Sequence, residues 1–277
     1  METEGLEAEN VKLKEQVSEL QKRETARLKS PYPNLEAIDQ MSYLEGTKLR
    51  FGLVSDTHFG SNRFRLDSLK SMYDLFDKAG VNRVYHSGDI TDGTRVYRGQ
   101  EYELADHGFD AQKDAVVRDY PHLKEGKTFF LQGNHDHSFM KSDGASIGAA
   151  IARERKDMVY VGDVERDIKM ARGLLLRLRH PDGAAAYASS YKLERYIAGL
   201  QPNGKKPNII SSGHFHRAFF MDSRNIFAFE TPCFQDQTLF MAAKGLSPVI
   251  GGWLVDVIID KKGSIVRCMP ELIKYYA

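Results

Sequence analysis

The sequence predicts an α/β fold in which a mixed β-sheet, or a sandwich of two sheets, carries helices on its outer faces. In the first half of the chain, apolar runs of strand length alternate with a segment of helical periodicity, and in the second half strand-like segments predominate. Several apolar runs also end in acidic, amide or histidine residues beside a glycine or proline. Because ligands bind at the carboxyl ends of strands in open α/β sheets, these strand ends predict a functional site.

The composition predicts a soluble intracellular protein. The 277 residues suffice for one large domain or two small ones, and 42% of them are hydrophobic. A formal net charge of +1 argues against a globally basic coat for nucleic acid, although local patches remain compatible with it. Cys233 and Cys268 form no motif, so we expect a reducing cytoplasm and no disulfide framework. The acidic N-terminus is no secretory signal, and we expect no membrane span.

Residues 1–28 are predicted to form a separate N-terminal helix. Glu and Lys flank a seam whose members recur at alternating spacings of four and three, as in a short coiled coil. The seam consists of Leu6, Asn10, Leu13, Val17 and Leu20. An asparagine at an a-like position favours one register, so one interpretation is a homodimer through this helix, and the other is a solvated single helix. Two prolines then end the helix, and residues 29–47 are assigned to a linker.

Residues 48–277 are predicted to form the main domain. Its first half contains the strands KLRFGLVSD, VNRVYHSGD and KTFFLQGNHD. A helix over 68–80 follows the first strand, and an insertion with helical stretches covers about 94–120. The second half contains the strand-like segments GLLLRLRHPDG, PNIISSGHFH, NIFAFETP and GWLVDVIIDKKGSIVRCM, the last with a turn at DKKG.

Five of these segments end in residues that can hold metal ions. Alternate residues of an extended segment point the same way, so His214 and His216 could share a metal, although two surface histidines in a turn are the simpler explanation for that pair alone. Five such ends in one chain, with oxygen and imidazole donors mixed, are difficult to explain by surface solvation. The end blocks are SDTH with Asp56 and His58, SGDITDG with Asp89, QGNHDH with Asn134 and His135, RLRHPDG with His180, and SGHFHR with His214 and His216.

The order of these blocks, D-x-H, G-D, G-N-H-D, H and G-H-x-H, resembles the calcineurin-like metallophosphoesterase superfamily over roughly residues 48–260. It is also similar to phage and prokaryotic metallophosphoesterases and to the nuclease subunit of double-strand-break repair complexes. The capping domain and partner-binding tail of that repair nuclease are not identifiable here. The resemblance implies a four-layer metallophosphoesterase sandwich, in which two mixed β-sheets are flanked by helices.

The resemblance further implies two divalent metal ions and a hydroxide that bridges them and attacks phosphorus. The first ion would be held by Asp56, His58, Asp89 and His216, and the second by Asp89, Asn134, His180 and His214. His135 would stabilise the transition state or protonate the leaving oxygen, and Asp136 would orient His135. A donor set of oxygen and nitrogen without thiolate suits Mn²⁺, Fe or Zn²⁺ better than Mg²⁺, and we expect manganese.

The glycines and the remaining polar residues of these blocks have their own expected roles. Gly88, Gly133 and Gly213 are expected to let the backbone turn tightly, so that the next side chain reaches inward. Asp92 either supports the site or caps a turn. His86 is interpreted as a packed core histidine.

The expected activity is hydrolysis of phosphodiester bonds, in nucleic acid such as DNA or in nucleotides. Arginines flank an aromatic residue at two places near the metal blocks, where they could grip a phosphate backbone while the ring stacks a base. These arginines are Arg63 and Arg65 around Phe64, and Arg95 and Arg98 around Tyr97. Ordinary solvated loops are the alternative explanation.

Two other functions remain open at this point. One is a phosphomonoesterase acting on small metabolites or phosphoproteins. The other is a non-catalytic scaffold, as in polymerase small subunits that keep the fold and lose ligands, although the intact ligand set argues against it.

Overall fold

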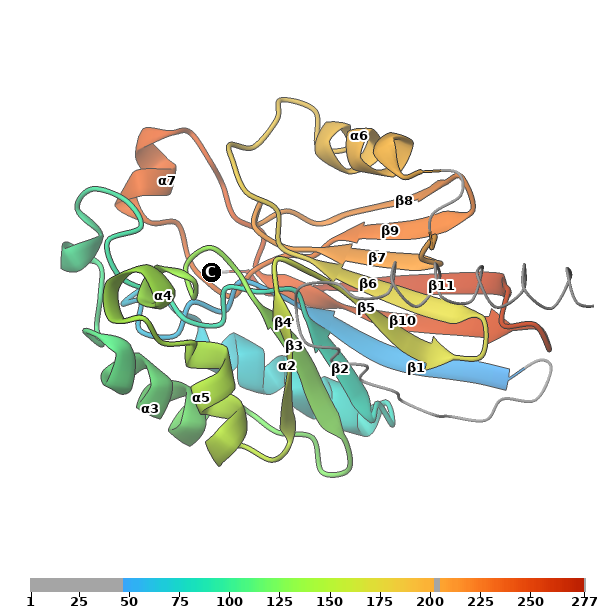
Figure 1. Cartoon of the computed structure of the whole chain (residues 1–277), viewed down its shortest axis with the longest axis horizontal. Coiled ribbons are helices and arrows are strands. Elements are labelled where there is room, and N and C mark those ends of the chain that lie inside the picture. The colour runs from blue at the N-terminus through green and yellow to red at the C-terminus, as the bar shows by residue number, and fades with distance from the viewer. Residues whose placement is uncertain (1–46, 202–204, 277) are drawn as a thin grey trace, which may run out of the picture. The chain divides into compact units, whose positions relative to one another are not determined.

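Two mixed β-sheets pack face to face, and helices cover their outer faces (Figure 1). The computed structural model describes residues 47–201 and 205–276. The N-terminal helix over 1–28, its predicted dimer and the linker over 29–47 therefore lie outside the described residues, apart from Thr47.

The first sheet has six strands in the order β11-β10-β1-β2-β3-β4. Its strands are β1 (Thr47–Val54), β2 (Arg83–His86), β3 (Lys127–Gln132), β4 (Met158–Asp163), β10 (Gly251–Ile259) and β11 (Ile265–Lys274). β1 to β4 run parallel, and β10 and β11 are antiparallel additions at one edge. Parallel strands are covered on both faces, so they read as continuous apolar runs such as TFFL in β3, whose residues are buried.

The second sheet has five strands in the order β5-β6-β7-β9-β8. Its strands are β5 (Glu165–Ala171), β6 (Leu174–Arg179), β7 (Ile209–Ser212), β8 (Phe219–Ser223) and β9 (Ile226–Glu230). β6, β7 and β9 are parallel, whereas the edge strands β5 and β8 are antiparallel to their neighbours.

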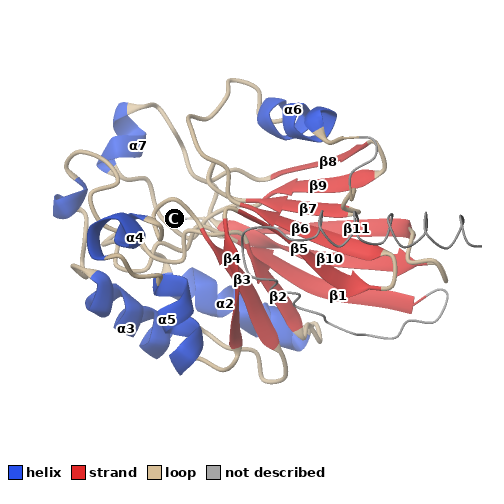
Figure 2. Ribbon diagram, viewed as in Figure 1, coloured by secondary structure: helices blue, strands red, loops and turns tan. Residues whose placement is uncertain are grey.

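The longer helices form the two outer layers (Figure 2). α2 (Leu66–Lys78), α3 (Phe109–Asp119) and α5 (Ile147–Glu154) cover the first sheet, and α6 (Tyr191–Gly199) covers the second. The short helices lie among the loops at one end of the strands: η1 (Gln100–Tyr102), α4 (Ser138–Asp143) and α7 (Leu239–Ala243). Among the described residues, no helix is long and apolar enough to cross a lipid bilayer.

Three hydrophobic clusters separate the four layers. Met72 and Phe76 of α2 pack in the cluster between the helices and the first sheet. Phe51 of β1 belongs to the central cluster between the two sheets. Leu193 and Ile197 of α6 pack against the second sheet. The predicted four-layer sandwich of two mixed sheets and flanking helices is therefore confirmed.

The contact between β1 and α2 gives a test of this packing. A Cβ built on Gly52 would meet the ring of Phe76, which fills that space and is fully buried. We expect Gly52→Ala to lower the free energy of unfolding by about 1–3 kcal/mol, because overpacking a filled core forces its side chains apart. The measurement is the midpoint of urea denaturation at an unchanged slope.

Gly199→Ala is the matched control for that experiment, because nothing lies within 4 Å of a Cβ at Gly199. Its effect should stay within about 0.5 kcal/mol. An unchanged midpoint for Gly52→Ala would show that the β1–α2 contact has room for an additional methyl group.

Candidate metal centre

The structure brings the seven predicted ligands together where strands of both sheets end. Asp56 and His58 follow β1, Asp89 follows β2, Asn134 follows β3, His180 follows β6, and His214 and His216 follow β7. The loops after β1 and β2 are joined by backbone hydrogen bonds, from Asp56 N to Gly88 O at 2.9 Å and from His58 N to Asp89 O at 3.1 Å. The backbone N–H of His214 donates to both Asp56 carboxylate oxygens at 3.0 Å, which fastens the second sheet to the first.

Asp56, His58 and His216 form the first candidate ligand set, a group of side chains that could hold one metal ion. The Nε2 atoms of His58 and His216 are 3.1 Å apart. Asp56 Oδ1 lies 3.3 Å from His216 Nε2 and 3.9 Å from His58 Nε2. His58 donates its Nδ1–H to Asp92 Oδ1 at 3.0 Å, so its Nε2 carries a lone pair that faces the other two ligands.

Asp89, His180 and His214 form the second ligand set, and Asn134 adjoins it. His180 donates Nδ1–H to Ser87 O at 2.7 Å. Its Nε2 then faces two oxygen acceptors, Asp89 Oδ2 at 3.0 Å and Asn134 Oδ1 at 3.1 Å. His214 donates Nε2–H to Gly183 O at 2.8 Å, which leaves Nδ1 as its ligand atom.

Both sets fit a divalent cation. Donors bound about 2.0–2.2 Å from one ion lie roughly 3 Å from one another. The separation of 3.1 Å between His58 and His216 and that of 3.0 Å between Asp89 and His180 match this value, whereas Asp56 and His58 are farther apart at 3.9 Å. Electron pairs that converge in a buried place need a shared cation or a proton, because nothing else offsets their repulsion. The donors are carboxylate oxygen, amide oxygen and imidazole nitrogen, the mixture that Mn²⁺, Fe and Zn²⁺ accept.

The charges of the second set depend on one another. Burial raises the pKa of Asp89, but the surrounding histidines, His180 first among them, together hold that pKa well below its usual range. Burial lowers the pKa of His180, but Asp89, Asp56 and the Ser87 carbonyl together raise it to about 9. Burial and then His180 lower the pKa of His214 to about 4, so His214 has the neutral form that binds metal.

The backbone at the site is strained. Five of the seven ligands have a left-handed backbone, which costs an L-residue about 1–2 kcal/mol. They are Asp56 (φ 51°), His58 (52°), Asp89 (54°), His214 (80°) and His216 (53°). Strain of this kind persists where surrounding contacts hold it and clusters at functional sites.

Two of the predicted glycine positions are explained by close approach to the ligands. A Cβ at Gly133 would meet the Asp89 carboxylate and would lie 2.7 Å from His180 Nε2. A Cβ at Gly213 would lie 2.7 Å from Asp56 Oδ2. Any larger residue at either position would displace a ligand.

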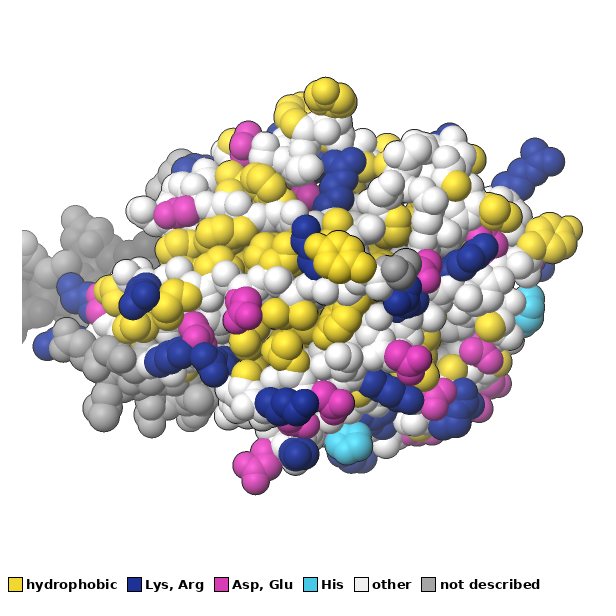
Figure 3. All heavy atoms as spheres, turned by 180° about the vertical axis from the view of Figure 1, so that it is seen from behind, with side chains coloured by type: hydrophobic (Ala, Val, Ile, Leu, Met, Phe, Trp, Pro, Cys, Tyr) yellow, Lys and Arg dark blue, Asp and Glu magenta, His cyan; other side chains and the backbone are white. Residues whose placement is uncertain are grey.

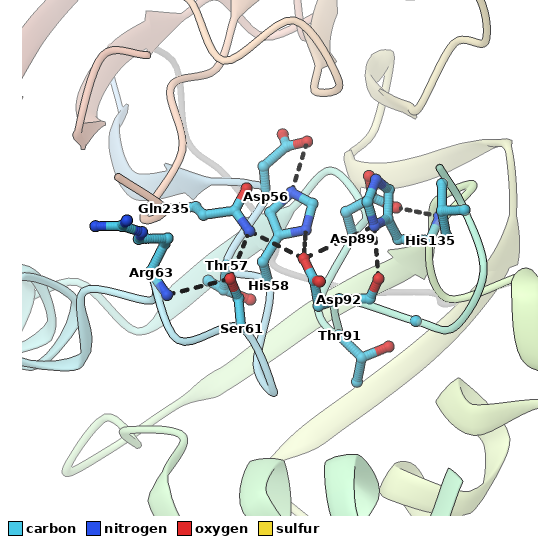
Figure 4. A network of polar contacts seen from close by, with 12 residues as sticks. Asp56, Thr57, His58, Ser61, Arg63, Asp89, Thr91, Asp92, His135 and Gln235 are labelled. Atoms are coloured by element: carbon cyan, nitrogen blue, oxygen red, sulfur yellow. Dashed lines mark hydrogen bonds and ion pairs between the residues drawn. The ribbon is translucent and has the colours of Figure 1, made fainter. Parts of the chain in front are cut away.

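Asp92 is a hub behind the ligands (Figure 4). Its carboxylate accepts hydrogen bonds from His58 Nδ1, from Gln235 Nε2 at 2.9 Å and from Gln100 Nε2 at 3.0 Å. Of the two predicted roles for Asp92, the structure supports the one in which it supports the site. Gln100 and Gln235 had no signal in the sequence, because neither belongs to a motif and Gln235 is 143 positions from Asp92.

His135 and Asp136 differ from the expectation in their contacts. His135 donates Nδ1–H to Asp92 O at 2.6 Å, and its backbone N–H donates to Asp89 Oδ1 at 2.8 Å. The Asp136 carboxylate instead accepts bonds from the backbone of Ile90, Thr91 and Gly133 and from the Thr91 hydroxyl. The expectation that Asp136 orients His135 is thus corrected: Asp92 holds the ring, and Asp136 ties together the loops after β2 and β3.

His86 and the four arginines predicted to bind substrate lie outside the two ligand sets. His86 is buried against Thr57, with its Nε2 3.2 Å from Thr57 Oγ1, as expected of a core histidine. Arg65 pairs with Asp236 at 3.0 Å, so its charge is already neutralised. Arg63 is exposed, and in Figure 4 its guanidinium points away from the ligands. Arg95 and Arg98 are exposed in the loop after β2.

Comparison with known proteins gives one family match over most of the domain. The model of the calcineurin-like phosphoesterase family matches residues 49–218, a range that includes all seven ligands. The chain is 24% identical to the DNA polymerase II small subunit of Halobacterium salinarum, over 71% of this chain and 46% of that protein. It is 23% identical to the DNA polymerase II small subunit of Methanothermobacter thermautotrophicus, over 72% of this chain and 50% of that protein. The chain thus spans about half the length of these curated relatives.

Solved structures give weaker similarities. An archaeal phosphodiesterase aligns with a TM-score of 0.42 and 14% identity, over 81% of this chain and 100% of the other. Vps29 from Entamoeba histolytica in complex with zinc aligns with a TM-score of 0.39 and 12% identity, over 82% of this chain and 99% of the other. Neither similarity supports an inference about activity.

The Asp92 hub gives a test of the first ligand set. Asp92→Asn keeps the size of the side chain but removes the carboxylate that orients His58, so we expect the affinity for Mn²⁺ to fall about 10–100-fold. Isothermal titration calorimetry with MnCl₂ measures this change. Asp110→Asn, at an exposed position of α3, is the matched control. Equal affinity in the two variants would show that Asp92 does not position a ligand.

Proposed function

The chain belongs to the calcineurin-like phosphoesterase family, and we propose that it is a two-metal phosphodiesterase that acts on nucleic acid or nucleotides. One observation carries the proposal: two ligand sets meet at the same strand ends, with His135 beside them. Asp89 belongs to the second set and also contacts the backbone of His135.

The proposal assigns the seven side chains to two divalent ions. The first ion would be held by Asp56, His58, Asp89 and His216, and the second by Asp89, Asn134, His180 and His214. Bound divalent ions, of which we propose manganese, would polarise the phosphoryl oxygens and make hydroxide available at neutral pH. If Asp89 contacts both ions, its carboxylate would offset the repulsion between the two positive charges.

His135 supplies the proton chemistry. Its Nδ1–H is held by the Asp92 carbonyl oxygen, which fixes the ring and leaves Nε2 free. When Nε2 is protonated, it donates to a phosphoryl oxygen or transfers its proton to the leaving oxygen. The side chain of His135 is 14% exposed, so a substrate can reach it.

Two observations favour a nucleic-acid or nucleotide substrate. The curated relatives are DNA polymerase subunits by name, which points to a DNA-related context. Arg95 and Arg98 are exposed beside Tyr97 in the loop that follows the Asp89 block. On the face seen in Figure 3, basic and acidic side chains are interspersed, so that face has no broad positive field.

The names of the curated relatives also favour a second candidate, a polymerase accessory subunit whose site is not catalytic. A subunit of that kind has no need of two complete ligand sets and a positioned His135. The described residues keep all of them, so catalysis is the stronger proposal.

Hydrolysis of end-labelled single- and double-stranded DNA with Mn²⁺ tests the proposal. We expect the wild type to cleave DNA. Asp89→Asn should bind metal poorly and therefore lose activity, and in His135→Ala kcat should fall about 10²–10⁴-fold. His122→Ala, at an exposed histidine outside the ligand sets, should behave as wild type. Cleavage that survives both site substitutions would place the activity elsewhere or in a contaminant.

The choice of ester separates the candidates. For a phosphodiesterase, we expect faster cleavage of bis(4-nitrophenyl) phosphate than of 4-nitrophenyl phosphate. Preference for the monoester would make the protein a phosphomonoesterase. Two bound metals without cleavage of either ester would favour the accessory subunit.

A further inference from the structure

Two aromatic side chains from distant parts of the chain stack beside His135. The rings of Tyr97 and Phe240 have centroids 4.8 Å apart at an interplanar angle of 28°. The Tyr97 ring is also 6.4 Å from the His135 ring, in an edge contact at 60°. Through Tyr97, the pair therefore borders the imidazole that we place at the reacting phosphate.

A single buried carboxylate fixes the pair in place. Tyr97 donates its hydroxyl to Glu103 Oε2 at 3.0 Å, and the backbone N–H of Leu239 donates to Glu103 Oε1 at 2.7 Å. Glu103 is 4% exposed, so both bonds are shielded from water. The loop that carries Tyr97 and the helix that carries Phe240 are therefore held in one geometry before any substrate arrives.

The same two segments are also tied to the ligands. Gln100 from the Tyr97 loop and Gln235, which precedes α7, both donate to the Asp92 carboxylate. Asp92 in turn holds His58 and His135. The hydrogen bonds to Asp92 thus fix the distance between the aromatic pair and the metal ligands.

The stack on Tyr97 leaves much of the Phe240 side chain uncovered. α7 contributes no buried residue to the core, and Phe240 is 41% exposed. Exposing so large an apolar ring to water brings no stability, whereas a flat ligand that covers it would remove that surface from water. The exposed Arg95 and Arg98 flank Tyr97 and can meet phosphates on either side of such a ligand.

We propose that the Tyr97–Phe240 pair is a stacking platform for a nucleobase of the nucleotide whose phosphate is cleaved. The platform selects nucleotides whose base has a free face, in single-stranded nucleic acid or at strand ends, because neighbouring bases cover both faces of a base inside a duplex. This inference rests on the proposed phosphodiesterase function and adds a specificity-determining site to it.

The first test compares two diesters that share one leaving group. Thymidine 5′-(4-nitrophenyl phosphate) carries a base, and methyl 4-nitrophenyl phosphate does not. In Phe240→Leu, kcat/KM for the thymidine ester should fall about tenfold more than kcat/KM for the methyl ester, mainly through KM. Leu239→Ala, an exposed neighbour on the same helix, should keep the wild-type ratio. An unchanged ratio in Phe240→Leu overturns the proposal, because a merely structural pair would affect both esters equally.

The second test does not depend on hydrolysis, so it separates failure of the platform from failure of the proposed activity. A single-stranded oligothymidine with a 2-aminopurine at its end is titrated with protein in the presence of Ca²⁺. Stacking of the 2-aminopurine quenches its fluorescence. We expect quenching by the wild type and by Leu239→Ala, and loss of most of it with Phe240→Leu. Binding without quenching, quenching that Phe240→Leu retains, or no binding of the wild type would each refute the platform, whether or not the esters are cleaved.

Discussion

The buried carboxylate of Asp89 is the interaction on which the rest of the site depends. It accepts a hydrogen bond from the His135 backbone, contacts His180 Nε2, and fits only because Gly133 has no side chain. These partners come from β3 of the first sheet and β6 of the second, so one carboxylate holds the ends of both sheets together. Burying such a charge costs several kcal/mol unless positive charge compensates it. The need to compensate the buried charge of Asp89 therefore favours cations at this end of the fold.

The strain in the backbone follows from that arrangement. The predicted ligands follow five strands and converge on one place, and at five of the seven positions the chain turns them there in a left-handed conformation, as at Asp56 and His216. Behind them, Asp92 is held by hydrogen bonds from two glutamines that are remote in the sequence, and it orients the rings of His58 and His135. The aromatic pair is joined to the same hub, so metal ligands, the proton donor and the platform share one support.

Much of the fold was predictable from local pattern, and the unpredicted parts are those that local pattern does not determine. Central strands such as β1 and β3 are buried on both faces and read as apolar runs. The edge strand β5 was not predicted, because Glu165, Asp167 and Lys169 interrupt its apolar residues. The ligands were recognisable because each stands at the end of a predicted strand, in a short block with a glycine, a proline or another ligand. The partner of His135 was not, because adjacency in sequence pointed to Asp136 while the loops placed Asp92 there.

Diffraction from crystals grown with Mn²⁺, measured at the manganese absorption edge, would locate the bound ions. We expect two anomalous peaks, one among Asp56, His58 and His216 and the other among Asp89, His180 and His214, with Asp89 in contact with both. A single peak, or two peaks that Asp89 does not join, would contradict this expectation.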